Sequence, residues 1–237
     1  HVVYLGEHGQ KLNKILSTSF PDTNAQIQSA SKDKKKYIVR VSSPTDPGTF
    51  YLLDLDANKI EMLSFNYQKV DVSKLSEMQQ ISYIARDGLE INGYLSFPAG
   101  SNGKNLPTII MPHDGPVARD NWGYDYRVQF LTTRGYAVLQ MNFRGSTGYG
   151  FEFRQKGRHE WGRKMLEDIN DGAKWMIDQG YADPKRVCLV GEGFGGYAAL
   201  QSIVKDQSLY KCSAAIAPIT DLEVRFGASR TNFVESK

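Results

Sequence analysis

Hydrophobic and polar positions follow two different patterns along the chain. Residues 1–65 contain short apolar or alternating runs, VVYL, IQSAS, YIVRVSS, TFYLLDL and KIEMLSF, separated by polar turns such as KDKK and SPTDPG. Turn signals recur about every ten residues, which is typical of an antiparallel meander. We therefore predict four or five antiparallel strands in this part of the chain.

After residue 65 the pattern changes. Residues 66–80 are polar and are predicted to be a linker, whereas later segments such as PTIIMPH, YAVLQMNFR, RVCLVGE and CSAAIAPIT are apolar runs of the buried-strand type. Helical patterns lie between them, and in one of these Trp161, Met165, Ile169 and Ala173 recur at every fourth position. We interpret that stripe as core. The alternation of strands and helices predicts a largely parallel sheet covered on both faces.

The first 65 residues form a sheet too small to bury both faces. Four or five such strands resemble one blade of a β-propeller, which normally stacks on neighbouring blades. We therefore assign residues 1–65 to the end of a β-propeller domain and residues 81–237 to an α/β domain.

Composition and charge narrow the function classes. The 237 residues are 41% hydrophobic and 23% charged, which is ordinary for a globular chain. The net charge is +3, and acidic and basic residues alternate without the long basic stripe of nucleic-acid-binding proteins. There is no run of about 18 apolar residues, so we expect no membrane span.

Neither the histidines nor the cysteines indicate a metal site. The four histidines lack HxxxH spacing, and the two cysteines do not form a CxxC motif, so we expect no metal. Cys188 and Cys212 lie in apolar, strand-like runs, and we expect them to be buried reduced thiols rather than a disulfide. The cellular compartment, cytoplasmic or periplasmic, stays open.

The stretch VGEGFGGYAAL joins a predicted strand to a predicted helix and has two interpretations. Gly191, Gly193 and Gly196 form GxGxxG, a phosphate-binding fingerprint of dinucleotide sites. Alternatively, Gly191 and Gly195 flank the nucleophile elbow GxSxG of a hydrolase, with Gly193 at the position of the serine.

Two segments upstream favour the hydrolase interpretation. MPHDGP at 111–116 directly follows the strand PTIIM, where an α/β-hydrolase presents backbone N–H groups to a substrate carbonyl. NFRGSTGYGFEFR at 142–154 has the glycines of a tight loop at a strand end. A nucleotide site accounts for neither segment.

From about residue 37 to its end, the chain resembles the serine peptidases of the prolyl oligopeptidase family, particularly the branch of acylaminoacyl peptidases and dipeptidyl aminopeptidases. Six motifs occur in family order: SSPTDPGTFYLLD, YIARDGLEINGYLSFP, HDGP, RGYAVLQMNFRGSTGYG, WGRKMLEDINDGAKWMIDQGYADPKRV and VGEGFGGYAALQSI. The resemblance implies a partial α/β-hydrolase fold, truncated after the nucleophile-elbow region and preceded by propeller strands.

The resemblance also implies roles for individual residues. The nucleophile position falls on Gly193, which tolerates the strained elbow backbone but offers no nucleophile. The oxyanion donors would be the backbone N–H groups of Phe194 and Gly115. Asp114 stands where the family usually has glycine, and we expect its carboxylate to point to solvent or to cap the following turn. His113 is expected to be structural, because the family's catalytic histidine follows the elbow in the chain.

The implied function is serine-type hydrolysis of short peptides, of acylaminoacyl or dipeptidyl type. We predict that this chain does not perform it, because Gly193 replaces the serine and the triad aspartate and histidine, which follow later strands in the family, are missing. Asp221 is expected in a strand-end loop at the rim of the site, where His113, Asp114 and Asp221 would face substrate. One alternative is a non-catalytic peptide-binding relative. Another is a nucleotide-binding protein that uses GEGFGG.

We expect no cofactor. The expected partner is a peptide substrate or ligand, with neither nucleic acid nor membrane, and homo-oligomerisation stays open.

Overall fold

The computed structural model describes residues 3–225, and the chain divides into two compact units. The first unit comprises the chain up to Met78 together with 122–133, and the second comprises 79–121 and the chain from 134 onward. We call them the β unit and the α/β unit.

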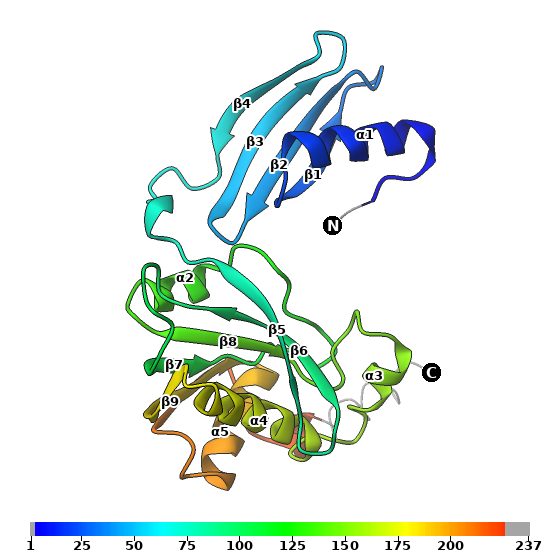
Figure 1. The fold of residues 1–237 in the computed structure, drawn as a ribbon. Coiled ribbons are helices and arrows are strands. Elements are labelled where there is room, and N and C mark those ends of the chain that lie inside the picture. The colour runs from blue at the N-terminus through cyan, green and yellow to red at the C-terminus, as the bar shows by residue number, and fades with distance from the viewer. Residues whose placement is uncertain (1–2, 226–237) are drawn as a thin grey trace, which may run out of the picture. The chain divides into compact units, whose positions relative to one another are not determined.

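The β unit contains a four-stranded antiparallel sheet (Figure 1). Its strands pair in chain order, and their bounds are β1 Asn24–Ala30, β2 Lys36–Ser43, β3 Asp46–Asp54 and β4 Lys59–Phe65. The turn between β1 and β2 contains the KDKK segment, so the polar turn predicted there is confirmed. The short apolar and alternating runs in residues 24–65, separated by polar turns, therefore correctly predicted antiparallel strands.

A helix that the sequence pattern did not predict precedes these strands. Residues Gly6–Ser19 form α1, and the residues before it that the structure describes are not a strand, so the strand predicted at VVYL is wrong for residues 3–5. Leu12 and Leu16 are buried against Tyr37 and Val39 of β2. The sequence pattern does not reveal α1, because Leu12 and Leu16 are among only a few apolar residues in an otherwise polar segment.

The β unit also contains the short 3₁₀ helix η1 Val72–Lys74 and the helix α2 Tyr126–Thr132. The buried amide of Gln129 joins them to the sheet. Its Nε2 donates to the carbonyls of Pro44 and Ser76, at 3.0 and 2.9 Å, and its Oε1 accepts from the Ser76 N–H at 2.8 Å. All three polar groups of this amide are thereby satisfied away from water.

The α/β unit is built on a six-stranded sheet of order β10-β9-β7-β8-β6-β5. Strands β7 to β10 run parallel, and β6 is antiparallel to β8, so the predicted parallel core is confirmed. The bounds are β5 Met78–Ile84, β6 Glu90–Ser96, β7 Leu106–Ile110, β8 Ala137–Asn142, β9 Ala182–Glu192 and β10 Cys212–Ile216.

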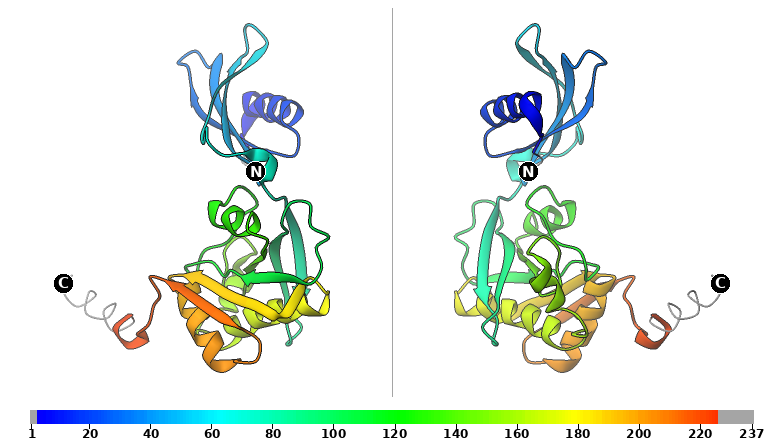
Figure 2. Two further views of the ribbon diagram at one scale, coloured as in Figure 1. Left: turned by 90° about the vertical axis from the view of Figure 1, so that its left-hand side faces the viewer. Right: turned by 90° about the vertical axis from the view of Figure 1, so that its right-hand side faces the viewer.

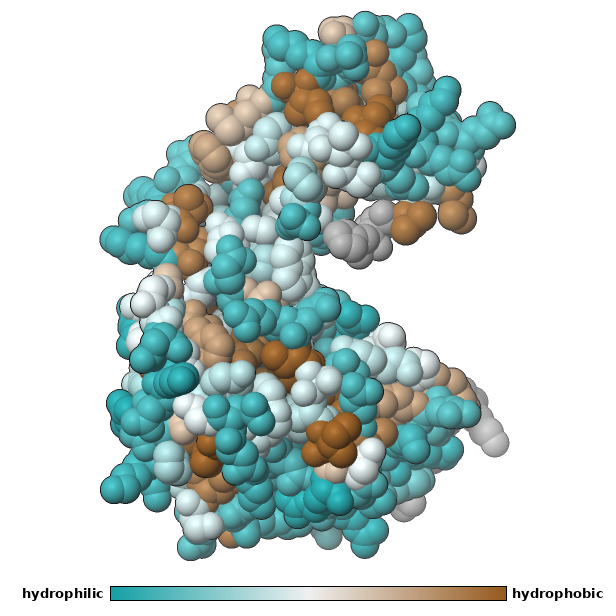
Figure 3. Space-filling view, viewed as in Figure 1, coloured by the Kyte–Doolittle hydropathy of each residue, from teal (hydrophilic) through white to brown (hydrophobic). Residues whose placement is uncertain are grey.

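The helices of this unit are α3 Phe151–Gln155, α4 Lys164–Asp178 and α5 Phe194–Lys205. The turned views show α4 and α5 together on one side of the sheet (Figure 2). Met165, Ile169 and Ala173 are buried and Trp161 packs against them, so the predicted core stripe is confirmed. Hydrophilic residues cover most of the visible face of this unit, with small separate apolar patches between them (Figure 3).

None of the helices in residues 3–225 combines the length and the apolar character that a membrane crossing requires.

The two cysteines form a disulfide, contrary to the expectation of reduced thiols. Cys188 of β9 and Cys212 of β10 are directly paired in the parallel register, with their Cα atoms 4.7 Å apart. Cys212 is exposed rather than buried. The sequence could not indicate this pairing because it depends on the register of two strands separated by a whole helix.

Candidate functional site

The turn between β9 and α5 has the backbone conformation of a nucleophile elbow. Gly193 has φ 53° and ψ −115°, a conformation that side-chain-bearing residues adopt only under strain. Its N–H donates to the carbonyl of Ile216 in β10 at 3.0 Å, and its own carbonyl accepts from the Tyr197 N–H at 3.0 Å. The elbow predicted at Gly193 is therefore present, and backbone hydrogen bonds on both sides hold it.

A glycine two residues later brings the MPHDGP loop against the start of α5. A Cβ atom at Gly195 would lie closer than 3.0 Å to the backbone oxygen of Pro112, a separation that real Cβ atoms do not reach. Only glycine permits this approach. The loop that carries His113, Asp114 and Gly115 is thereby held beside the elbow.

The carboxylate of Asp114 turns toward the elbow, which corrects the expectation that it points to solvent or caps its own turn. Its Oδ1 accepts a hydrogen bond from the backbone N–H of Phe194 at 2.6 Å. Phe194 is the first residue of α5, where N–H groups lack partners within the helix and the helix dipole favours negative charge. Asp114 therefore caps α5 from a distant segment and satisfies the predicted oxyanion donor itself.

Asp114 also takes the space of the missing nucleophile. A Cβ atom built on Gly193 would lie closer than 3.0 Å to all three terminal atoms of the Asp114 side chain. A serine side chain begins with this Cβ, so serine at 193 and the observed position of Asp114 exclude each other. Gly193 and Asp114, the two residues that depart from the family pattern, are thus adjacent in space. The position of the Asp114 side chain excludes a side chain at 193.

The second predicted oxyanion donor lies in the same loop. Gly115 is exposed and has φ 134°. Its N–H makes no hydrogen bond to another residue of the described range 3–225. One of the two predicted donors is thus occupied by Asp114, while the other keeps its N–H available.

His113 is half-buried and holds the loop in place. Its Nδ1 lies 2.7 Å from the carbonyl oxygen of Asp114, its Nε2 lies 2.9 Å from the Ser146 hydroxyl, and its ring stacks on Phe143. Burial lowers the pKa of His113 to about 4, against the opposing effect of its bond to the Asp114 carbonyl. A neutral ring with both nitrogens engaged fits the structural role that was predicted.

Asp221 follows β10 and is exposed. Its Oδ1 accepts from the Val224 N–H at 2.9 Å, so this carboxylate begins a helical turn. The predicted strand-end loop is confirmed, and contact of Asp221 with substrate stays a prediction.

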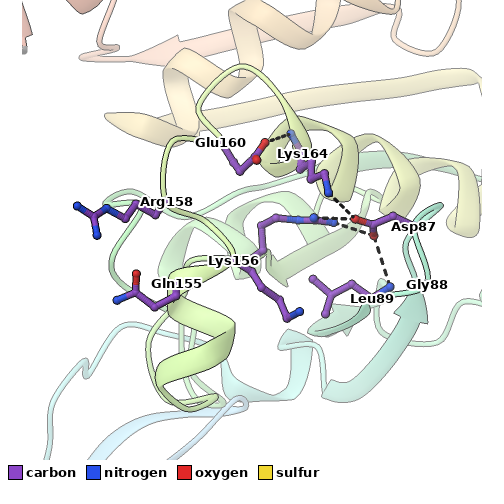
Figure 4. Close-up of a pocket in the computed structure, with 9 residues that line it drawn as sticks. Asp87, Gly88, Leu89, Gln155, Lys156, Arg158, Glu160 and Lys164 are labelled. Carbon is purple, nitrogen blue, oxygen red and sulfur yellow. Dashed lines mark hydrogen bonds and ion pairs between the residues drawn. The ribbon is translucent and has the colours of Figure 1, made fainter.

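A buried ion-pair cluster of Arg144, Asp168 and Asp87 supports the turn that follows β8, and the sequence pattern did not predict it. Figure 4 shows Asp87 of this cluster beside Lys164. Arg144 is 3% exposed and makes bidentate hydrogen bonds to Asp168 and to Asp87 at 2.6 to 2.9 Å. Its backbone N–H also donates to Asp168. Arg144 keeps the pKa of Asp87 well below its usual range. A single arginine after a strand gives no signal of burial.

Residues 3–225 contain no group of three or more histidine, cysteine, aspartate or glutamate side chains placed to hold a metal ion.

Comparison with known proteins gives a consistent result. Residues 122–235 match the model of the prolyl oligopeptidase family. Dipeptidyl aminopeptidase BIII of Pseudoxanthomonas mexicana is 31% identical over 206 residues, which cover 84% of this chain and 30% of that protein. Inactive dipeptidyl peptidase 10 of Rattus norvegicus is 25% identical over 210 residues, 87% of this chain and 25% of that protein.

Among solved structures, a puromycin hydrolase superposes with a TM-score of 0.71 and 27% identity, covering 85% of this chain and 31% of that one. The chain thus spans about 30% of the length of dipeptidyl aminopeptidase BIII and of the puromycin hydrolase. The expected α/β-hydrolase fold, in part, is confirmed.

Proposed function

The chain belongs to the prolyl oligopeptidase family, and from this premise we propose that its α/β unit binds peptides and does not cleave them by the serine mechanism of family peptidases. In that mechanism the elbow residue supplies the attacking oxygen, and backbone N–H groups stabilise the oxyanion that forms. In this chain Gly193 supplies no attacking oxygen, and the N–H of the adjacent Phe194 is already bonded to Asp114.

One observation carries the proposal, the hydrogen bond from the Phe194 N–H to the Asp114 carboxylate. A substrate carbonyl that enters the oxyanion site must displace this carboxylate, because a single N–H cannot serve both. If the carboxylate stays nearby, its negative charge opposes the oxyanion as it develops. The missing side chain of Gly193 and the position of Asp114 therefore disable attack and stabilisation together.

What remains is a folded site with a free backbone donor. Gly115 is an exposed residue whose N–H lacks a partner within residues 3–225, and the elbow keeps its backbone bonds. Backbone donors of this kind bind peptide carbonyls without any nucleophile. One relative carries the word inactive in its name, which is consistent with loss of catalysis in this family.

The nucleotide alternative has little support. A phosphate at GEGFGG would bind the N-terminus of α5, where unpartnered N–H groups and the dipole attract anions. Asp114 already holds the first of those N–H groups with a negative charge, which repels a phosphate.

The test combines a fluorophosphonate probe with peptide binding. We expect the protein to remain unlabelled by the probe and to leave the peptide Ac-Ala-Phe-Gln-Gln-Ala-NH2 intact, while calorimetry detects its binding. The peptide is neutral, so its binding does not depend on charge. Labelling of the protein by the probe, or cleavage of the peptide, would contradict the second half of the proposal, and absence of binding would contradict its first half.

A matched variant tests the steric argument. Asp114→Gly together with Gly193→Ser restores the residues usual in the family at both positions, and Gly193→Ser alone leaves Asp114 in conflict with the new side chain. We expect the single variant to be less stable than the double one, measured by thermal unfolding. Equal stability of the two would show that Asp114 does not occupy the nucleophile's space.

A further inference from the structure

The positive charge of the chain is concentrated in one segment of the α/β unit. Residues 154–164, RQKGRHEWGRK, contain five lysine or arginine residues and one glutamate, so this segment carries a formal charge of +4 when histidine is neutral. The whole chain carries only +3. We call residues 154–164 the basic segment. The net charge of the whole chain does not reveal the charge of this segment, because the remaining residues are together slightly acidic.

Several cations of the basic segment lack partners. The side chains of Arg154, Lys156 and Arg158 make neither a hydrogen bond nor an ion pair with any residue of the described range. The nearby acids are engaged elsewhere, because Asp87 pairs with Arg144 and Glu160 accepts from the backbone N–H of Lys164. Figure 4 shows Arg158 extending away from Asp87 and Lys164. These guanidinium groups are therefore available to a ligand.

A cavity of about 410 Å³ lies against the basic segment. Its lining combines two kinds of side chain. Arg154, Arg158 and His159 supply polar groups, while Trp161 and Met165 supply an apolar wall. A cavity of this size and composition suits an organic ligand that carries both an anionic group and an apolar group.

The cavity adjoins the elbow. Pro116 and Val117, which also line it, directly follow the oxyanion loop. Trp161 packs edge-on against Phe194 with ring centroids 4.7 Å apart, and Phe194 carries the N–H that Asp114 occupies. One aromatic contact therefore separates the cavity from the site at which a peptide would bind.

We propose that this cavity is a subsite for an acidic side chain of a bound peptide. The carboxylate would bind the unpaired guanidinium groups of Arg154 and Arg158, since a guanidinium matches a carboxylate in geometry and charge. An apolar neighbour in the peptide would lie on Trp161 and Met165. The inference rests on the proposed peptide-binding function and adds a preference for acidic peptides.

The experiment compares two peptides that differ only in charge. Binding of Ac-Ala-Phe-Glu-Glu-Ala-NH2 and of Ac-Ala-Phe-Gln-Gln-Ala-NH2 is measured by calorimetry at low salt. We expect the acidic peptide to bind about tenfold more tightly, the gain typical of one charge-assisted hydrogen-bond pair. Arg154→Gln with Arg158→Gln is expected to abolish this difference, and raising the salt concentration is expected to reduce it.

Lys185→Gln is the matched control, because it removes one positive charge near the start of β9, whereas the elbow follows the end of that strand. It should keep the preference. Equal affinity of the protein for the two peptides overturns the subsite and leaves the proposed function standing. Failure of both peptides to bind overturns the proposed function instead.

Inorganic phosphate provides the remaining arm of the test. If phosphate binds in a manner that depends on Arg154 and Arg158 while both peptides bind equally, the cavity is a site for free anions and the subsite is overturned. All substituted positions are exposed, so the variants should fold, and circular dichroism checks this.

Discussion

Two turns of the α/β unit, one after β8 and one after β9, differ in how they are stabilised. The turn after β8 depends on a side chain, because Arg144 is buried between Asp168 and Asp87. The turn after β9 depends on the backbone, because Gly193 has no side chain and is held by bonds to Ile216 and Tyr197.

The difference shows which features of a catalytic fold can be lost. At the β9 turn the strained elbow persists without a nucleophile, since glycine adopts φ 53° at little cost. At the β8 turn no such substitution is available, because removal of the guanidinium would leave a buried charge on Asp168. The nucleophilic side chain can thus be lost from the β9 turn while the neighbouring β8 turn keeps its structure.

The largest expected effect lies at the β8 turn. Arg144→Met should lower the free energy of unfolding by about 3 to 5 kcal/mol, because Asp168, fully buried, loses its partner. Urea unfolding followed by tryptophan fluorescence measures this. Arg86→Met is the control: it removes a bidentate pair with Asp171 on an arginine whose side chain is 45% exposed, and should cost about 1 kcal/mol or less. Similar losses in both variants would mean that Arg144 is hydrated.

The next effect tests the β9 turn. Gly193→Ala should cost about 2 to 3 kcal/mol, because alanine is strained at a positive φ and its Cβ displaces Asp114 from the helix N-terminus. Asp114→Gly alone should cost about 1 kcal/mol, the worth of a cap. In the double variant the two costs should not add, since the clash has been removed. Strict additivity in thermal or urea unfolding would show that the two positions are independent.

The third expected effect is a pH dependence that comes from His113 in the MPHDGP loop after β7. The pKa of His113 is about 4 in the folded chain, below the ordinary value of 6.5, so the unfolded chain binds the proton first as pH falls. The contribution of the neutral His113 ring to the free energy of unfolding is present above pH 6.5 and is lost as the pH falls toward 4. Between pH 7 and pH 5 this should amount to about 2 kcal/mol.

His113→Gln should reduce that pH slope in urea unfolding, whatever its effect on stability at pH 7. Ser146→Ala is the control, because it removes the hydroxyl partner of His113 but keeps the buried ring, and so it should preserve most of the slope. An unchanged slope in His113→Gln would mean that the histidine titrates as a solvated group.

The sequence predicted the features that depend on local chain geometry. GEGFGG identified the elbow at Gly193, and the spacing of Met165, Ile169 and Ala173 identified the core face of α4. Such features are readable because a strand-to-helix glycine turn and a helical period are encoded in adjacent residues.

Features that depend on distant segments could not be predicted. The contact of Asp114 with Phe194 spans 80 residues, and it requires the close approach at Gly195 that no local pattern reveals. The pairing of Cys188 with Cys212 requires the register of β9 and β10. The burial of Arg144 requires two aspartates from separate segments. The sequence therefore does not predict in which direction such side chains point or which charged groups pair.

The disulfide has a topological consequence for the elbow. Cys188 and Cys212 are 24 residues apart, and the chain between them contains the elbow and all of α5. These residues form a covalent ring, which restricts the unfolded chain and is worth about 3 kcal/mol for a loop of this length. A protease that cut anywhere inside the ring would open it without releasing a fragment, so a nicked molecule would still carry both ends of the site as one covalent piece.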